Sequence, residues 1–418
     1  MGKITRVTGS LLEGFLPGAA VGSQCYIHTT EKKKVLAEVV GFKDQKALMM
    51  PFYDIQGIGL GSKIILDKQV SSIKVGKAIL GRVLNGLGQE IDGKGALETT
   101  EEIDIYRKVV NPLERRPIVE PLDLGVRAIN GLISVGKGQR IGIMAGSGVG
   151  KSVLLGQMAR NTVADVNVIA LIGERGREVR EFIESDLGPE GLARSVIVCA
   201  TSDESPLMRM RGAFVATAIA EYFSDMGLNV LFMMDSVTRF AMAQREIGLN
   251  VGEPATTKGY TPSVFALLPK LLERMGSFES GSSITGLYTV LVEGDDMDDP
   301  IADSVRSIVD GHIVLTRKLA HKGHFPAIDV LQSASRVMRK VIQEEHMDCA
   351  LQFRELLATY AEAEDLINIG AYKSGASPKI DRAIRLREKM EKFLRQKVEE
   401  KASFNDAVYG MMDILHAD

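Results

Sequence analysis

The sequence predicts an α/β protein with three parts: an N-terminal β-barrel, a central domain built on a mostly parallel sheet, and a C-terminal helical domain. Over residues 1–74, short strand-like runs alternate with turn residues at roughly ten-residue spacing, which is typical of a small barrel. Strand and helix patterns then alternate, as in a parallel sheet. From about residue 344 the pattern changes to amphipathic, highly charged helices. The expected domains are therefore 1–74, 75–343 (with a crossing linker over 75–120) and 344–418.

The composition sets the broad class. A chain of 418 residues is longer than one core usually holds, and 45% hydrophobic with 25% charged residues is typical of a soluble globular protein. The net charge of −3 gives no bulk attraction for nucleic acid, and no apolar run approaches the ~20 residues of a membrane span. The three cysteines form no CxxC pair, which fits a reducing cytoplasm and excludes a disulfide framework. We expect a cytoplasmic protein that binds no nucleic acid.

Six apolar or alternating runs predict the barrel strands. They are Ile4–Val7, Gln24–His28, Val35–Val40, Ala47–Met50, Lys63–Ile65 and Val70–Val75.

The best-defined pattern in the chain is Ala145-Gly-Ser-Gly-Val-Gly-Lys-Ser152, between the apolar run Arg140–Met144 and a helical pattern. Glycines let backbone N–H groups turn toward a phosphate, and the start of the helix adds its positive end. Lys151 is expected to reach the β- and γ-phosphates of a nucleotide, and Ser152 to place its hydroxyl on Mg²⁺. The expected nucleotide contacts are Gly146, Ser147, Gly148, Val149, Gly150, Lys151, Ser152 and Val153.

The strict form of this pattern begins with Gly, whereas this sequence has Ala145. The later glycines are the ones that must approach phosphate closely, so the interpretation holds. The alternative is a Gly-rich turn between a strand and a helix that binds nothing. The adjacent Lys151 and Ser152 favour the phosphate site.

After this loop, five apolar runs predict buried strands and two periodic segments predict helices. The strands are Val166–Ile172, Ser195–Ala200, Asn229–Met234, Ser283–Val292 and His312–Leu315, and the helices are Glu178–Leu187 and Pro206–Phe223.

Two acidic residues follow strands of this sheet. Asp235 ends the run Asn229–Met234, where a carboxylate can hold Mg²⁺ directly or through water. Glu174 follows Val166–Ile172, and ligands sit at the carboxyl ends of parallel strands. Glu174 is thus expected to polarise an attacking water, with Arg175 steadying the phosphate. The alternative for Glu174 and Arg175 is an ordinary salt-bridge cluster with nearby charged residues such as Glu178.

In the C-terminal part, Ser377-Pro378 predicts a helix start, with the serine as N-cap and the proline at the first helical position. The residues expected on its apolar face are Ile380, Ile384, Met390, Phe393 and Leu394.

For the stretch Phe325–Arg336, spacing alone predicts only a loop and a helix start. The residues themselves, however, resemble a known family signature. Its core, Pro326-Ala-Ile-Asp-x-x-x-Ser-x-Ser335, resembles the signature of the rotary ATP synthase α/β superfamily. Gly173–Phe182 and Met234–Phe240 are closer to one branch, the export ATPases of type III secretion. Within it the chain most resembles the flagellum-specific ATPases, on the stretches Ser205–Met210, Ala241–Ile247, Gly252–Tyr260 and Ile369–Tyr372.

The resemblance implies a RecA-like P-loop ATPase domain between the barrel and the helical domain, and a homohexamer that binds ATP with Mg²⁺ between subunits. Residue by residue, Glu174 matches the catalytic carboxylate and Arg175 a phosphate-contacting arginine. Asp235 matches the Mg²⁺-supporting aspartate and Arg336 the arginine finger given to the neighbouring subunit. Phe325 matches the adenine-stacking position.

The same resemblance implies partners and a location. It implies a coiled-coil stalk subunit near the loop Gly252–Tyr260, an export gate, chaperones and secreted substrates, with the ring peripherally associated with the inner membrane at the export apparatus. The family usually has a further N-terminal segment that binds a stator-like regulator. This sequence begins almost at the barrel, so the resemblance does not extend to that regulator.

Several alternatives stay open at this stage. An ATPase of a virulence (injectisome) secretion system uses the same catalytic parts as a flagellar one. A catalytic subunit of a rotary ATP synthase is disfavoured by the stretch Met234–Arg239. A non-catalytic subunit is disfavoured because Glu174 is present, and an RNA translocase of the Rho kind because the barrel is weakly charged.

Overall fold

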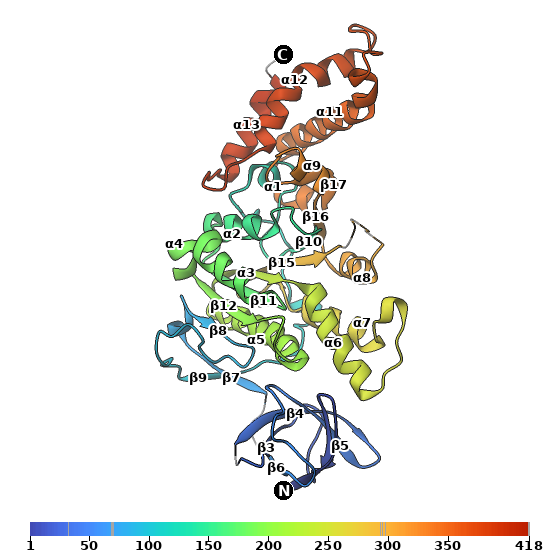
Figure 1. Ribbon diagram of the computed structural model, residues 1–418. Coiled ribbons are helices and arrows are strands. Elements are labelled where there is room, and N and C mark those ends of the chain that lie inside the picture. The colour runs from blue at the N-terminus through green and yellow to red at the C-terminus, as the bar shows by residue number, and fades with distance from the viewer. Residues whose placement is uncertain (32, 68–70, 293, 295, 297, 417–418) are drawn as a thin grey trace.

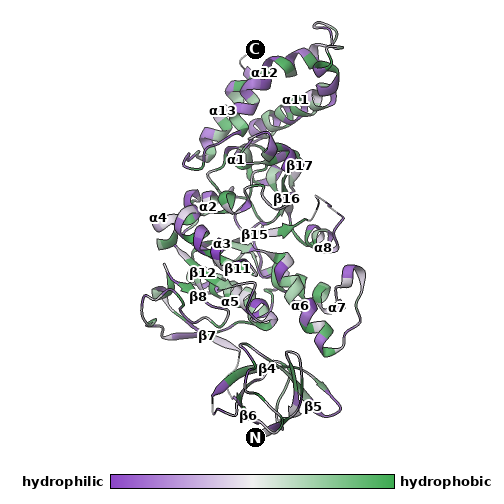
Figure 2. Cartoon of the chain, in the orientation of Figure 1, coloured by the Kyte–Doolittle hydropathy of each residue, from purple (hydrophilic) through white to green (hydrophobic). Residues whose placement is uncertain are grey.

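The computed structural model shows three parts in a row (Figure 1), with the barrel at one end, the helical domain at the other and the central sheet between them. It describes all residues except 32, 68–70, 293, 295, 297 and 417–418. The two ends of the chain lie at opposite ends of the molecule. Figure 2 shows hydrophilic and hydrophobic residues interspersed along the C-terminal helices, as expected of helices that bury one face.

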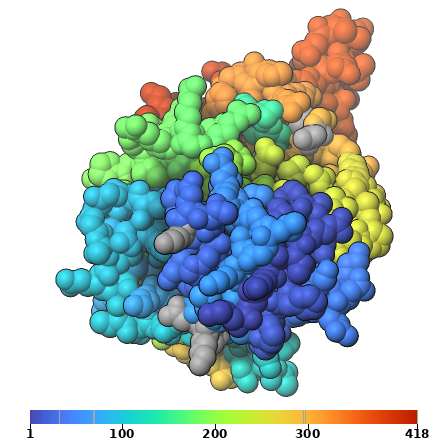
Figure 3. Space-filling model, turned by 60° about the horizontal axis from the view of Figure 1, so that its bottom comes forward, coloured from blue at the N-terminus to red at the C-terminus, as the bar shows by residue number. Residues whose placement is uncertain are grey.

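Six antiparallel strands form a closed barrel in the order β1-β2-β5-β4-β3-β6, which confirms the predicted N-terminal barrel. The strands are β1 (Gly2–Thr8), β2 (Leu11–Phe15), β3 (Gln24–His28), β4 (Lys34–Lys43), β5 (Lys46–Pro51) and β6 (Lys63–Leu66). Strand β2 was not predicted, because Glu13 and Gly14 interrupt its apolar pattern; its pairing with β1 and β5 defines it. Figure 3 shows the barrel as the blue surface at the front of the molecule.

The prediction of a barrel strand over 70–75 is wrong in its pairing. Strand β7 (Ser72–Val75) lies outside the barrel and pairs with β9 (Glu101–Asp104) in a separate two-stranded sheet, while Val70 lies outside the described residues. Between them, β8 (Val83–Leu84) adds to the edge of the central sheet beside β12. The segment expected to be a linker therefore supplies a strand to the domain onto which it crosses.

The central sheet has the order β17-β16-β10-β15-β13-β11-β12-β8, with β14 paired to β15. All pairings along this path are parallel except that of the edge strand β17 with β16. The further strands are β10 (Arg140–Ala145), β11 (Val166–Ile172), β12 (Ser195–Ala200), β13 (Asn229–Asp235), β14 (Gly276–Ser277), β15 (Ser283–Leu291), β16 (Gly311–Leu315) and β17 (Ile328–Ser335). The mostly parallel sheet is as predicted.

Helices connect these strands. They are α1 (Arg127–Leu132), α2 (Lys151–Asn161), α3 (Gly176–Glu181), the π-helical turn η3 (Phe182–Leu187), α4 (Gly188–Ala193), α5 (Pro206–Asp225), α6 (Val237–Val251), α7 (Pro262–Leu272), α8 (Pro300–Ile308) and α9 (Arg317–His321), with short 3₁₀ turns η1 (Lys77–Ile79), η2 (Pro112–Glu114) and η4 (Thr257–Gly259).

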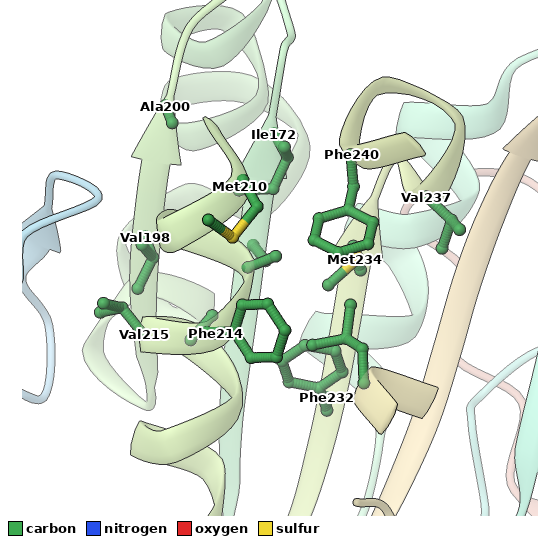
Figure 4. Packing of buried hydrophobic residues seen from close by; sticks show 14 of the residues in the cluster. Ile172, Val198, Ala200, Met210, Phe214, Val215, Phe232, Met234, Val237 and Phe240 are labelled. Carbon is green, nitrogen blue, oxygen red and sulfur yellow. The ribbon is translucent and has the colours of Figure 1, made fainter. Parts of the chain in front are cut away.

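Helix α5 packs across strands β11, β12 and β13 and forms the middle of the main core. Figure 4 shows Met210 and Phe214 of α5 lying over Ile172 and Met234, whose strands lead into the functional site. The Phe214 ring meets that of Phe240 edge-on, with ring centroids 6.0 Å apart. This packing holds the carboxyl ends of β11 and β13 in position relative to each other.

The stretch 325–336 was expected to be a loop followed by a helix start, and this prediction is wrong. Residues Ile328–Ser335 form the edge strand β17, antiparallel to β16. Its side chains alternate only partly between buried and exposed, which hides the strand pattern in the sequence. The helix α10 begins later, at Met338.

The C-terminal domain consists of α11 (Glu344–Asn368), α12 (Pro378–Leu394) and α13 (Phe404–His416), after the short α10 (Met338–Val341). Helix α12 begins as predicted with Pro378 in its first turn, but the Ser377 side chain makes no capping hydrogen bond. Its buried face also differs from the prediction. Ala383 and Leu386 are buried with Met390, Phe393 and Leu394, whereas Ile380 is half-buried and Ile384 is exposed.

One buried ion pair ties the central domain together away from the Gly-rich loop 145–152. The Arg274 guanidinium, 1% exposed, donates to both carboxylate oxygens of Glu221 at 2.7 and 2.6 Å and to the backbone oxygen of Ile105 at 2.7 Å. Arg274 follows α7, Glu221 lies on α5, and Ile105 follows β9. Removing one partner of such a pair leaves the other charge buried without compensation.

We therefore predict that Arg274→Ala lowers the free energy of unfolding by about 3–5 kcal/mol. The double change Arg274→Met with Glu221→Leu is expected to recover most of this loss, because it removes both charges and keeps the volume. The measurement is the midpoint of urea unfolding. Arg180→Ala, which removes only an exposed pair with Glu184, is the surface control and should leave the midpoint nearly unchanged. An unshifted midpoint for Arg274→Ala would contradict the structural role of the pair.

Candidate active site

The predicted phosphate-binding loop lies between β10 and α2, at the carboxyl end of the parallel strands. Val149 is buried and anchors the loop, whereas Ser147 and Gly148 are exposed. Gly150 has φ 82° and directly precedes α2, a left-handed conformation that favours glycine. The first N–H groups of α2 thus face the loop, with Lys151 and Ser152 in the first turn. This is an arrangement that binds phosphate.

Three charged side chains from different elements meet at the end of the sheet. The Lys151 ammonium contacts Oδ1 of Asp235 in a short ion pair and lies 3.5 Å from Oε1 of Glu174. Asp235 ends β13, and Glu174 follows β11 by two residues. All three side chains are largely buried, with Asp235 4% exposed. The structure thus brings together three residues that the sequence placed at strand or loop ends.

This cluster carries two carboxylates for one ammonium. Burial raises the pKa of Glu174 to about 7, with the Asp235 charge adding to the shift and Lys151 opposing it. Burial alone would lower the pKa of Lys151, but attraction to Asp235 and Glu174 outweighs it and raises that pKa. A carboxyl group with a raised pKa, beside a lysine that can bind phosphate, is suited to accept a proton from water.

Strand order explains how Lys151 reaches Asp235. Strand β15 lies between β10 and β13, so the lysine crosses the end of β15. On β15, the Thr289 hydroxyl lies 2.7 Å from the same Asp235 oxygen. Thr289 was not among the residues predicted from the sequence, because its role depends on β15 inserting between two strands that precede it in the chain.

Arg239, in the first turn of α6, is a second residue that the sequence analysis did not assign. Gly173, with φ 72°, packs against its aliphatic stem, because a Cβ at Gly173 would lie 2.6 Å from Cβ of Arg239. The buried Nε of Arg239 has no hydrogen-bond partner among the described residues. The stretch Met234–Phe240 was singled out in the sequence, and Arg239 is its one basic residue, which is the signal that could have found it.

A cleft of about 1270 Å³ opens beside the loop, between the central domain and the C-terminal helices. Its lining includes Gly150 and Val153, Phe325, and the segment Gln396–Glu400. The Phe325 ring is half-exposed and lies within 3.5 Å of where a Cβ of Gly150 would be. A ring in this position offers a flat apolar face to a nucleotide base.

The structure does not bring the two other predicted arginines to this cluster. The Arg175 side chain is 78% exposed and pairs with Glu178 at 3.2 Å. Arg336 follows β17 and donates to the backbone oxygens of Val309 and Arg306. Its own N–H binds Asp310, whose N–H in turn binds the oxygen of Arg140 at the start of β10. The loop follows the other end of β10, roughly 17 Å away at about 3.3 Å per residue.

The donor set fits Mg²⁺ bound with a nucleotide. Ser152 supplies a hydroxyl, Asp235 a carboxylate, and both are hard oxygen donors of the kind Mg²⁺ prefers. The described residues contain no group of three or more His, Cys, Asp or Glu side chains that could hold a metal by themselves. Mg²⁺ typically uses one or two protein ligands and takes the rest from phosphates and water.

Comparison with known families identifies the protein class. The nucleotide-binding domain of the ATP synthase alpha/beta family matches residues 125–335, and the beta-barrel domain of that family matches residues 4–66. The chain belongs to the ATP synthase alpha/beta family. Within this family, residues 342–413 match the C-terminal domain of the type III secretion ATPase EscN. The chain is accordingly an ATPase of the flagellar and type III secretion branch of the ATP synthase alpha/beta family.

Relatives cover the chain almost completely. The flagellum-specific ATP synthase of Bacillus subtilis is 54% identical over 99% of this chain and 94% of its own length, and that of Salmonella typhimurium is 50% identical over 98% and 92%. The solved structure of the assembled ATPase EscN from enteropathogenic E. coli matches with TM-score 0.93 at 45% identity, covering 99% of this chain and all of that chain. EscN has also been solved in complex with its central stalk EscO.

The charge of Glu174 gives a test that separates binding from chemistry. We predict that Glu174→Gln binds Mg-ATP like the parent but splits it at least a hundredfold more slowly, because general-base catalysis contributes about 10²–10⁴ in rate. Binding of a fluorescent ATP analogue and release of phosphate are the two measurements. Glu178→Gln, which changes the neighbouring carboxylate, is the matched control and should retain most of the activity. Normal hydrolysis by Glu174→Gln would reduce Glu174 to a salt-bridge residue.

Proposed function

We propose that the chain hydrolyses Mg-ATP to drive protein export through a flagellar type III secretion apparatus. The observation that carries this proposal is the convergence of Lys151, Glu174 and Asp235 beside a Gly-rich loop and a half-exposed Phe325. The loop N–H groups and Lys151 hold the phosphates, and the Phe325 ring stacks on adenine. Glu174 accepts the proton of the attacking water. Mg²⁺, held by Ser152 and supported by Asp235, would neutralise charge on the phosphate oxygens.

The active site is completed by a second copy of the chain. Arg336 lies at the opposite end of β10 from its own loop and is exposed to solvent, so it is suited to a neighbour's nucleotide. An arginine supplied to the transferring phosphoryl group is worth about 10³–10⁵ in rate. We propose a homohexamer with Arg336 as this finger and Arg175, exposed at the rim of the site, as a second phosphate contact.

The proposal includes partners and a location. The assembled EscN structure and its complex with the stalk EscO support a ring of this chain around a coiled-coil stalk. The loop Gly252–Tyr260 is the proposed stalk contact; its Lys258 is half-exposed and pairs with Asp296 and Asp299. The export gate, chaperones and secreted substrates are the further partners. No helix among the described residues is both long and apolar enough to cross a membrane, and we propose a cytoplasmic ring held peripherally at the inner membrane.

Mixing two inactive variants tests the shared site. We predict that Lys151→Ala and Arg336→Ala each hydrolyse almost no ATP, and that Arg336→Ala still binds it. The loss for Arg336→Ala corresponds to about 4–7 kcal/mol at roughly 1.4 kcal/mol per tenfold. Mixed together, the two variants should regain partial activity, because some interfaces then pair an intact loop with an intact arginine.

The parent's specific activity should rise steeply with protein concentration as rings form. Arg339→Ala, which changes a nearby exposed arginine, is the control for the Arg336 variant and should remain active. An activity independent of concentration, together with no recovery in the mixture, would show that one chain holds a complete site.

The flagellar assignment is tested in cells. Deleting the gene is expected to abolish swimming, and the parent chain but not Glu174→Gln should restore it. Flagellum-specific relatives at 54%, 50% and 47% identity overlap with type 3 secretion system ATPases at 49%, so the swimming test and not the identity decides between the two. A deletion strain that swims normally but no longer secretes proteins into host cells would assign the chain to an injectisome instead.

A further inference from the structure

The Asp235 carboxylate accepts hydrogen bonds from two side chains in the cluster, Lys151 and Thr289. These two side chains differ in conformational freedom. Lys151 reaches Oδ1 through a flexible side chain from the start of α2. The Thr289 hydroxyl reaches the same oxygen at 2.7 Å from the middle of the sheet. Within the described chain no hydrogen bond reaches Oδ2, so that oxygen is available to water or a cation.

Thr289 is held rigidly. Its residue is fully buried, on strand β15, which pairs with β10 on one side and β13 on the other. A β-branched side chain on a central strand has little rotamer freedom. Two residues further on, the N–H of Leu291 binds the hydroxyl of Thr238 on α6, which fixes the end of β15 against the element that follows Asp235.

The arrival of a nucleotide separates the two donors. Under the proposed function, Lys151 is drawn to the β- and γ-phosphates, so its contact with Asp235 weakens when the metal has to be held. Thr289 has no such second role. A hydroxyl carries a single proton, and although the Met234 backbone oxygen lies at 3.2 Å, the shorter contact to the charged carboxylate is favoured.

We propose that Thr289 is a positioning residue for metal-dependent ATP hydrolysis: its hydroxyl fixes the Asp235 carboxylate with Oδ1 occupied, so that Oδ2 is presented to Mg²⁺ and its water shell. This inference rests on the proposed function of Asp235. Residues that orient a metal-supporting carboxylate typically contribute 10–100-fold in metal affinity or activity.

The test compares Thr289→Val, which keeps the shape and removes the hydroxyl, with Thr289→Ser, which keeps the hydroxyl. Binding of a fluorescent ADP is measured in EDTA and then during a titration with Mg²⁺, alongside kcat and KM for ATP. Thr289→Val should bind ADP in EDTA like the parent. It should need about 10–100-fold more Mg²⁺ to reach half of the fluorescence change that Mg²⁺ causes in the bound ADP. Its kcat should fall by a similar factor, and its KM for ATP should change less than about threefold. Thr289→Ser should lie within about threefold of the parent.

A buried hydroxyl elsewhere provides the control. Thr217 on α5 is also fully buried and donates to the backbone oxygen of Ala213 at 2.8 Å, away from the cluster. Thr217→Val should lower thermal stability without changing the Mg²⁺ requirement. Thr289→Ala serves as a second hydroxyl-free variant should the valine not be accommodated, and it should behave as predicted for Thr289→Val.

Two results would overturn the inference: hydroxyl-free variants with a Mg²⁺ requirement within about twofold of the parent's, or a Thr289→Ser variant as impaired as Thr289→Val. Both are distinct from a failure of the proposed function. A parent chain that binds Mg-ADP but hydrolyses no ATP would contradict that function, while the Mg²⁺ titration would still decide the role of Thr289.

Discussion

The structure of the site depends on an unequal charge balance, in which the buried carboxylates of Asp235 and Glu174 share the single ammonium of Lys151. Burial and the charge of Asp235 raise the pKa of Glu174, while Lys151 opposes that shift. A nucleotide that withdraws Lys151 toward its phosphates would leave both carboxylates uncompensated. This charge balance supports the proposal that the nucleotide binds together with a cation such as Mg²⁺.

This charge cluster requires a particular strand order. The sheet places β15, a late strand, between β10 and β13, and Lys151 crosses its end to reach Asp235. The same order puts β16 and the antiparallel β17 on the other side of β10. Because β17 runs in the reverse direction, its last residues lie beside the start of β10 and not beside the loop. The strand direction thus places Arg336 away from its own loop, which supports its proposed role at the site of another copy of the chain.

Local patterns in the sequence were sufficient for the barrel, the parallel sheet and the ends of β11, β12 and β13, because continuous apolar runs and turn residues mark these elements directly. The predicted cluster of Lys151, Glu174 and Asp235 also follows from local signals, since each residue ends a strand or begins a helix. What local patterns missed depends on pairing. Strand β17 has weak alternation, β7 pairs outside the barrel, and Thr289 joins the site only through sheet order. The face of α12 was misjudged because its contacts with α11 and α13 decide which apolar side chains are buried.

The two neighbouring domains are joined to the ATPase core in physically different ways. At the barrel, Arg211 of α5 lies 3.6 Å from Glu38 of β4, and both are almost fully buried. Burial raises the pKa of Glu38, and the Arg211 charge opposes this shift. Loss of either partner would leave the other charge buried without compensation.

At the helical domain, the joint is a shared apolar core, in which Leu132 of α1 is buried in one cluster with Phe353 of α11 and Met390 of α12. The irregular segment between α12 and α13 adds hydrogen bonds such as that from Gln157 to the backbone oxygen of Lys397. This segment also lines the cleft beside the Gly-rich loop. The loop Thr201–Ser205 links the barrel to the site, because the Ser205 hydroxyl donates to the Phe52 oxygen of the barrel and the Ser202 N–H donates to the backbone oxygen of Glu174. The backbone of Glu174, the proposed catalytic residue, is thereby connected to the barrel through a single short loop.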